Sequence, residues 1–228
     1  MRWLLVVSLS CGDTNGVAEL AQILAQYGSR VHARANFFDH GASACIALRQ
    51  LNGSSTTVSF VPGFKTMLWR TLSPRLTAPY DYIWLKDSDV VASQRLFRLD
   101  EVEHWMLTAN ATVAQPSILP LDSTVPWHGW WTPFRASFAG SCMVTTSPIV
   151  EQMSPIFLRE SFDAFRSHLL TIPSVWLSTD FGLETFWCGL EWWSDALERE
   201  RGSRCIVINH LSVVHANTRP TSEMTNTS

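Results

Sequence analysis

Two aspartates separated by one residue carry the clearest chemistry in the sequence. Asp87 and Asp89 follow Asp81–Leu85, a short run rich in isoleucine and aromatic residues that predicts a buried strand. Residues two apart in an extended or gently turning backbone point the same way, so both carboxylates can bind one hard divalent cation such as Mg²⁺ or Mn²⁺. Aspartates also cap backbone N–H groups in turns. The local pattern therefore leaves a metal site and a solvated turn open.

Two further acidic residues, Asp180 and Glu184, stand four positions apart. The pair Thr179-Asp180 is typical of a helix N-cap, and a helix over Phe181–Gly189 would place both carboxylates on one face. A carboxylate at a helix start can act as a general base toward a hydroxyl group. Asp180 can equally serve only as the cap of this helix.

A single lysine near the middle of the chain is a candidate for binding an anion. Lys65 follows the turn Pro62-Gly63 at the start of a predicted helix, Phe64–Leu72. Backbone N–H groups at a helix start and a lysine ammonium both favour phosphate. The alternative is an ordinary solvated surface lysine.

Tryptophan is unusually frequent, with eleven in the chain. Six of them lie in two groups, and their flat rings are suited to stacking on sugars or nucleobases. The alternative is that they belong to the core, which we favour for Trp84 and Trp105. The two groups are Trp127, Trp130 and Trp131, and Trp187, Trp192 and Trp193.

Composition narrows the class of protein. Of 228 residues, 46% are hydrophobic and 16% charged, which favours one folded domain with a substantial core. A net charge of −3 gives no basic surface for nucleic acid.

The five cysteines form no CxxC pair, which argues against a structural zinc site. No apolar run is long enough to span a bilayer, and the start of the chain, although it imitates a signal peptide, fits a first buried strand better. The compartment therefore stays open.

The order of expected elements favours an α/β domain. A strand, a helix and a second strand open the chain at the spacing of a parallel unit with a right-handed crossover. The long irregular stretch around Trp127–Trp131 is typical of a functional loop. The expected strands are Arg2–Leu9, Arg30–Phe38, Thr56–Val61, Asp81–Leu85, Thr112–Gln115 ending at Pro116, one starting in Gly140–Val144, and Cys205–Val214 ending at His215. The other expected helices are Val17–Tyr27, Leu99–Ala109 and Ser161–Leu170.

Three blocks of the sequence resemble a family found largely in plants and algae. They are Tyr80–Val90 with the upstream Pro62–Lys65 and Leu72–Pro74, then Val150–Phe157 running on to Phe162, and Phe181–Glu184 followed by Cys188 and Val213–His215. Their order and spacing resemble the DUF707 family, a domain of unknown function whose plant members carry a label mentioning lysine ketoglutarate reductase trans-splicing. The family motif more often reads Trp-Asp-Glu-Asp, whereas this chain has Lys86 before Asp87; both aspartates are kept.

This family is similar to GT-A glycosyltransferases, and the resemblance implies a fold, an activity and a set of site residues. The implied fold is a single Rossmann-like α/β domain over residues 1–219, with a mostly parallel central sheet flanked by helices and a loose polar tail over 220–228. Asp87, Asp89 and His215 would bind a divalent cation, Mn²⁺ or Mg²⁺, that assists departure of the nucleoside diphosphate. His210 is expected to be structural.

The same resemblance assigns roles to the remaining candidates. Asp180 or Glu184 would act as the catalytic base, and Glu184 matches the family's Gly-Leu-Asp better. Glu151 would bind acceptor hydroxyls or orient a neighbour, and Lys65 would meet a phosphate. Trp130 and Trp131 would belong to an acceptor lid or to a simple packed loop. Longer family members carry an N-terminal anchor that this sequence lacks, which makes the chain either a short form or a part of a longer protein.

Three classes of function compete. The first is a metal-dependent glycosyltransferase that moves a sugar from a nucleotide-sugar donor to a glycan or another hydroxyl acceptor. The second is a non-catalytic, carbohydrate-binding relative of the same fold, which would not need Asp87, Asp89 and His215. The third is a haloacid-dehalogenase-type phosphatase, whose Asp-x-Asp follows the first strand, whereas three strands are expected before it here. Fold alone does not decide between them.

Overall fold

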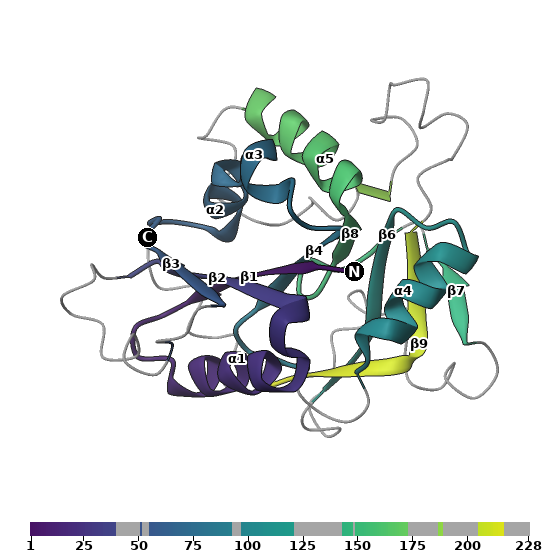
Figure 1. Ribbon diagram of the computed structural model, residues 1–228, viewed down its shortest axis with the longest axis horizontal. Helices are drawn as coiled ribbons and strands as arrows, with labels where there is room; N and C mark the ends of the chain where they lie inside the picture. Colours follow the sequence, from purple (N-terminus) through teal and green to yellow (C-terminus); the bar gives the residue numbers. More distant parts are fainter. Residues whose placement is uncertain are drawn as a thin grey trace.

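A computed structural model describes residues 1–39, 51, 55–92, 97–120, 143–147, 149–172, 187–188 and 205–216. These residues form a three-layer α/β domain around one sheet, as the sequence predicts (Figure 1). The strand order is β3-β2-β1-β4-β8-β6-β9-β5, with β7 added beside β9. None of the helices in this described part combines the length and the apolar character that crossing a bilayer requires.

The first half of the sheet is parallel. Strand β1 (Trp3–Leu9) lies between β2 (Val31–Phe37) and β4 (Tyr82–Asp87), and β3 (Thr56–Ser59) pairs with the outer side of β2. The chain thus runs outward from β1 to β3 and returns to the other side of β1 as β4. This reversal of strand order is a topological switch point, and in open α/β sheets ligands bind in the crevice at the carboxyl ends of the strands on either side of it.

The second half of the sheet mixes directions, although most of the paired length in the whole sheet is parallel. Strand β8 (Ile156–Leu158) is antiparallel to β4 and β6 (Val113–Pro120), while β6 is parallel to β9 (Cys205–His215). Short strands β5 (Val90–Val91) and β7 (Val144–Thr146) pair antiparallel with β9. The first half of the long β9 therefore pairs with β7, and its end pairs with β5, the short strand that follows β4 in the chain.

Helices cover both faces of the sheet (Figure 1). Helices α1 (Thr14–Tyr27) and α4 (Leu99–Thr108) pack on one face, and α2 (Lys65–Thr71), α3 (Pro74–Thr77) and α5 (Arg159–Thr171) lie on the other. A single 3₁₀ turn, η1 (Gly28–Arg30), links α1 to β2. The domain is the doubly covered α/β architecture that the alternating elements predict.

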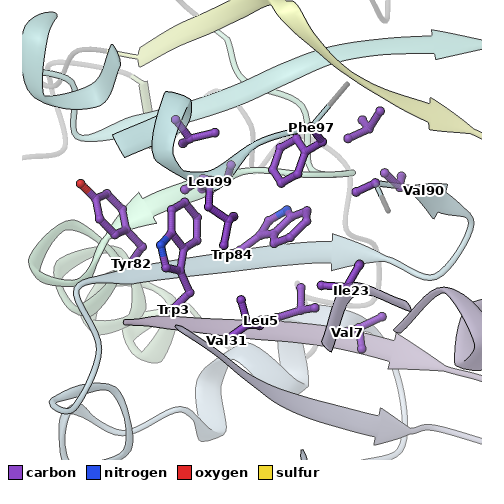
Figure 2. Packing of buried hydrophobic residues seen from close by; sticks show 14 of the residues in the cluster. Trp3, Leu5, Val7, Ile23, Val31, Tyr82, Trp84, Val90, Phe97 and Leu99 are labelled. Atoms are coloured by element: carbon purple, nitrogen blue, oxygen red, sulfur yellow. The ribbon is translucent and has the colours of Figure 1, made fainter. Parts of the chain in front are cut away.

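The alternation of side chains along β1 and β4 divides the core between the two faces. Trp3, Leu5 and Val7 join Tyr82 and Trp84 in the cluster under α1 and α4 (Figure 2). Their neighbours in sequence point the other way, into the cluster under α2 and α5. These neighbours are Leu4, Val6, Ile83 and Leu85. Because period-two alternation continues to the end of β4, Lys86 faces the α1 side and Asp87 faces the α2 side.

Several predicted boundaries need correction. Helix α1 begins three residues earlier than expected because the Asp13 carboxylate accepts a hydrogen bond from Gly16 N at 2.8 Å and caps it. Strand β6 does not end at Pro116 but continues to Pro120, with a register shift after Pro116 that accommodates the missing N–H. Strand β8 was not predicted, because three apolar residues directly before a helix carry too short a pattern.

The burial of the tryptophans shows which of the described ones belong to the hydrophobic core. Trp84 and Trp187 have no exposed surface, and Trp105 is partly buried against the same cluster as Trp84. Trp187 donates its indole N–H to Val150 O at 2.8 Å, so it is a core residue and not a stacking surface. Trp127, Trp130 and Trp131 lie outside the described residues.

One disulfide fixes the start of β9. Cys188 and Cys205 are bonded across a sequence separation of 17, and Cys11 also takes part in a disulfide. Loops of this length closed by a disulfide stabilise a fold by about 3 kcal/mol, chiefly through the unfolded state. We expect the double variant Cys188→Ala/Cys205→Ala to lose about that much free energy of unfolding in urea denaturation, with a larger m-value because the unfolded chain without the cross-link exposes more surface. Equal stability of the variant and the oxidised wild type would contradict this linkage.

Candidate functional site at the carboxyl end of strand β4

The predicted metal-binding aspartates lie at the switch point of the sheet. Asp87 is the last residue of β4 and lies level with Ser8 of β1, while Asp89 follows in the turn before β5. The loop after β1 therefore begins beside them. Three strands precede β4 in the chain, which also agrees with the expectation that weighed against the phosphatase class.

Backbone hydrogen bonds hold the turn from both sides. Asp87 N donates to Met153 O at 2.9 Å, and Ala216 N donates to Asp89 O at 2.7 Å. The segment before β8 and the end of β9 thus flank the turn that carries the two aspartates. Elements far apart in the sequence converge here, which is typical of a site positioned by a rigid scaffold.

His215 reaches the site as the sequence predicts. It is the last residue of β9, opposite Val90, and its Nε2 lies 3.1 Å from Asp89 Oδ2. Burial opposes ionisation of Asp89, but the hydrogen bond and the charge of His215 outweigh it, so the pKa of this carboxyl is lowered. His210 instead pairs with Glu101 at 2.6 Å, which agrees with a structural role.

Lys65 also reaches the site, through a contact that the sequence did not predict. Its Nζ lies 2.9 Å from Asp87 Oδ1 and 3.0 Å from Oδ2. Burial raises the pKa of Asp87, while the charge and the hydrogen bonds of Lys65 partly offset this. Lys65 therefore neutralises a predicted metal ligand.

A second lysine, Lys86, lies beneath the site and is buried. Its Nζ donates to Asp87 O at 3.1 Å, and it faces α1, where buried Glu19 accepts a hydrogen bond from Ala92 N. Burial lowers the pKa of Lys86 to about 8, against the pull of Glu19, Asp87, Asp89 and Asp13, in that order. The sequence identified Lys86 as a departure from the family motif but not as a buried group.

The lowered pKa of Lys86 predicts a specific pH dependence of stability. Between pH 8 and 10.5 the unfolded chain keeps a proton on Lys86 that the folded chain has lost, so the free energy of unfolding rises with pH. We expect a rise on the order of 3 kcal/mol from this group over that window. Urea denaturation of the chelator-treated wild type and Lys86→Met checks this. The other titrating groups cancel in the difference, and equal slopes in the two proteins would contradict the prediction.

Asp39 was missed by the sequence analysis. It follows the end of β2, and its carboxylate accepts hydrogen bonds from Ser10 Oγ at 2.6 Å and from Cys11 N at 3.0 Å. It thereby ties the loop after β1 to the neighbouring strand end. Its only sequence signal is an acidic residue close to the end of a strand, a signal that Asp87 shares.

Glu151 lies near the site, but in a buried position. It is 6% exposed, its N–H donates to Gln115 Oε1 of β6, and it stands two residues before Met153, whose carbonyl meets Asp87. A role in orienting neighbours fits this burial better than direct contact with a large acceptor. Asp180, Glu184, Trp130 and Trp131 lie outside the described residues.

Asp87, Asp89 and His215 are residue types that bind hard cations, but in this structure their side chains are paired with other groups of the chain. Two carboxylates and one imidazole are suitable ligands for Mn²⁺ or Mg²⁺, and the Asp89 side chain is 41% exposed. Within the described ranges, however, no three His, Cys, Asp or Glu side chains are gathered so as to hold a metal ion. Lys65 and His215 occupy the carboxylates instead, so a cation would have to displace Lys65 from Asp87.

Comparison with solved structures identifies the fold. No family model matches the chain, and no curated protein sequence matches it. S. aureus TarS 1–349 in complex with UDP-GlcNAc aligns with a TM-score of 0.60 at 10% identity, covering 100% of this chain and 62% of that one. The mannosyltransferase PcManGT from Pyrobaculum calidifontis, in complex with GDP-Man and Mn²⁺, aligns at 0.59 and 13%, covering 96% and 58%. The chain has the GT-A fold.

The likeness extends over nearly all of this chain but over a smaller share of each neighbour. A mycobacterial protein aligns with a TM-score of 0.52 at 14% identity, covering 98% of this chain and 70% of that one. The chain spans about three fifths of the length of the TarS 1–349 and mannosyltransferase structures. At these identities the similarity establishes the fold and leaves activity to the site itself.

Proposed function

We propose that the chain is a glycosyltransferase that moves a sugar from a nucleotide-sugar donor to a hydroxyl acceptor with the help of a divalent cation. The observation that carries the proposal is the placement of Asp87 and Asp89 at the switch point between β1 and β4 of a GT-A fold. The solved neighbours with this fold include complexes with UDP-GlcNAc and with GDP-Man and Mn²⁺.

The roles follow from the positions. Asp87, Asp89 and His215 would hold the cation, which when bound neutralises charge on the diphosphate leaving group. Lys65 contacts the Asp87 carboxylate and could meet a phosphate oxygen. Asp39 organises the loop after β1, and it would contact the nucleoside half of the donor.

The residues proposed to bind and activate the acceptor are identified from the sequence. In the transfer, the bond between the sugar's anomeric carbon and the phosphate oxygen breaks, and the acceptor oxygen forms the new bond to that carbon. The acceptor's proton passes to a carboxylate, for which Asp180 and Glu184 are the candidates. Trp130 and Trp131 would pack against the acceptor sugar.

Release of nucleoside diphosphate from a panel of UDP- and GDP-sugars tests this function. The wild type is incubated with Mn²⁺ and a mixture of sugar acceptors, and an Asp87→Asn variant serves as the control. We expect release from one class of donor that depends on Mn²⁺ and is lost in the variant. Wild-type release no higher than that of Asp87→Asn with every donor would contradict transfer and favour the non-catalytic carbohydrate-binding relative.

A further inference from the structure

The ammonium group of Lys65 is bound to the carboxylate of Asp87. Its Nζ lies within hydrogen-bonding distance of both carboxylate oxygens, 2.9 and 3.0 Å away. The lysine side chain is only 16% exposed, and its Nζ lies 5.9 Å from the ring centroid of buried Trp69, one turn further along α2. Lys65 is therefore held in place from two sides and is not a freely solvated surface lysine.

This contact uses the lone pairs that a metal ion would need. An ammonium bonded to both oxygens of Asp87 competes directly with a cation for the same carboxylate. Asp89 is likewise paired with His215 at 3.1 Å. Both aspartates thus already have a nitrogen partner from the chain itself.

Charge explains why a metal ion alone would bind poorly to this arrangement. Lys65 contacts Asp87 directly, and Lys86 lies buried beneath the same residue. A divalent cation that takes Asp87 from Lys65 leaves an ammonium group without its partner in a half-buried place, which is costly. A diphosphate arriving with the metal would supply a new anionic partner.

We propose that Lys65 is an internal counter-cation that leaves Asp87 for the donor's diphosphate when the metal binds, so that metal and nucleoside diphosphate bind together and each binds weakly alone. This inference rests on the proposed function for the identity of the second ligand. The coupling is reciprocal: the nucleotide tightens the metal by the same factor as the metal tightens the nucleotide. Lys65 thereby couples the binding of the metal to the binding of the diphosphate.

Metal affinity without nucleotide is the direct test. Mn²⁺ alone is titrated into the wild type and Lys65→Met, with free Mn²⁺ measured by electron paramagnetic resonance. Methionine keeps the stem over Trp69 and removes the charge. We expect Lys65→Met to bind Mn²⁺ at least tenfold more tightly than the wild type. Arg75→Met removes a charge from an exposed position on α3 and should leave Mn²⁺ affinity unchanged. Equal or weaker Mn²⁺ binding by Lys65→Met would overturn the proposal.

A second titration measures the coupling itself. UDP or GDP is titrated with and without Mn²⁺, and we expect the metal to tighten the nucleotide by a factor that is at least tenfold larger in the wild type than in Lys65→Met. If Lys65→Met folds poorly, Lys65→Gln replaces it in both titrations. Its thermal stability is first compared with that of the wild type, and the same changes in Mn²⁺ and nucleotide binding are expected. Lys65→Arg keeps the charge and should keep the weak metal binding.

The two proposals fail in different ways. If Lys65→Met gains Mn²⁺ affinity but neither protein binds any nucleotide, the competition at Asp87 stands and the glycosyltransferase proposal falls. If the wild type binds a nucleoside diphosphate with Mn²⁺ but Lys65→Met gains no metal affinity, the proposed function stands and the exchange at Lys65 falls.

Discussion

Replacing Asp89 by asparagine is expected to weaken nucleoside diphosphate binding in the presence of Mn²⁺ by on the order of a hundredfold. The change removes a negative charge from the turn between β4 and β5 while keeping the shape of the side chain. A cation held by Asp89 would offset negative charge on the diphosphate, and a hundredfold loss corresponds to about 2.8 kcal/mol because each 1.4 kcal/mol is tenfold in affinity. Titration calorimetry with UDP and GDP measures the effect.

A matched control for Asp89→Asn lies at the other end of the same strand. Asp81 is exposed just before β4 and accepts a hydrogen bond from Arg2 N at 2.8 Å. Asp81→Asn makes the same chemical change far from the switch point, so nucleotide affinity should stay within twofold of the wild type. Equal losses in the two variants would indicate a general electrostatic effect and would count against a metal site at Asp89.

Truncating Trp84 to alanine is expected to cost about 3–5 kcal/mol of the free energy of unfolding. Trp84 has no exposed surface and stacks on Phe97 (Figure 2), with ring centroids 4.7 Å apart. Its indole N–H donates to Ser154 Oγ at 2.9 Å. Alanine leaves a large cavity and an unpaired hydroxyl under the strand that carries Asp87. Urea denaturation followed by tryptophan fluorescence and circular dichroism measures the loss.

Two companions separate the contributions at Trp84. Trp84→Phe keeps most of the ring but loses the hydrogen bond to Ser154, so a loss of about 1 kcal/mol is expected. Leu107→Ala truncates a side chain on α4 that is 76% exposed and should change stability by less than about 0.5 kcal/mol. A loss below about 1 kcal/mol for Trp84→Ala would contradict the central place of Trp84 in this core.

The sequence predicted the elements that have strong local patterns. The alternation through β1 and β4 and the helical spacing of α1 and α5 each carry enough apolar residues to be recognised within their own segment. Strand β6 was cut short because Pro116 normally ends a strand, and its continuation depends on a register shift against β9. Strand β8 owes its existence to pairing with β4 and β6, which no local pattern reveals.

The candidate site was predictable only in part for the same reason. Asp87 and Asp89 stand out locally because carboxylates interrupt an apolar run, and His215 stands out because it ends the last strand. The structure places His215 beside Asp89, and its predicted role as a metal ligand stays a prediction. The partners of the other charges depend on which faces of β4 meet which helices. Lys65 contacts Asp87 because α2 covers one face, and Lys86 is buried because α1 covers the other. Such tertiary pairings cannot be read from spacing along the chain.

The central claim is that a nucleoside diphosphate and a divalent cation bind together at the carboxyl end of β4. Titration calorimetry of UDP and GDP with and without Mn²⁺, on the wild type and on Asp87→Asn/Asp89→Asn, tests it most directly. We expect one diphosphate to bind the wild type with Mn²⁺, to bind at least tenfold more weakly without it, and not to bind the double variant. Absence of binding under every condition, or equal binding by the double variant, would contradict the claim.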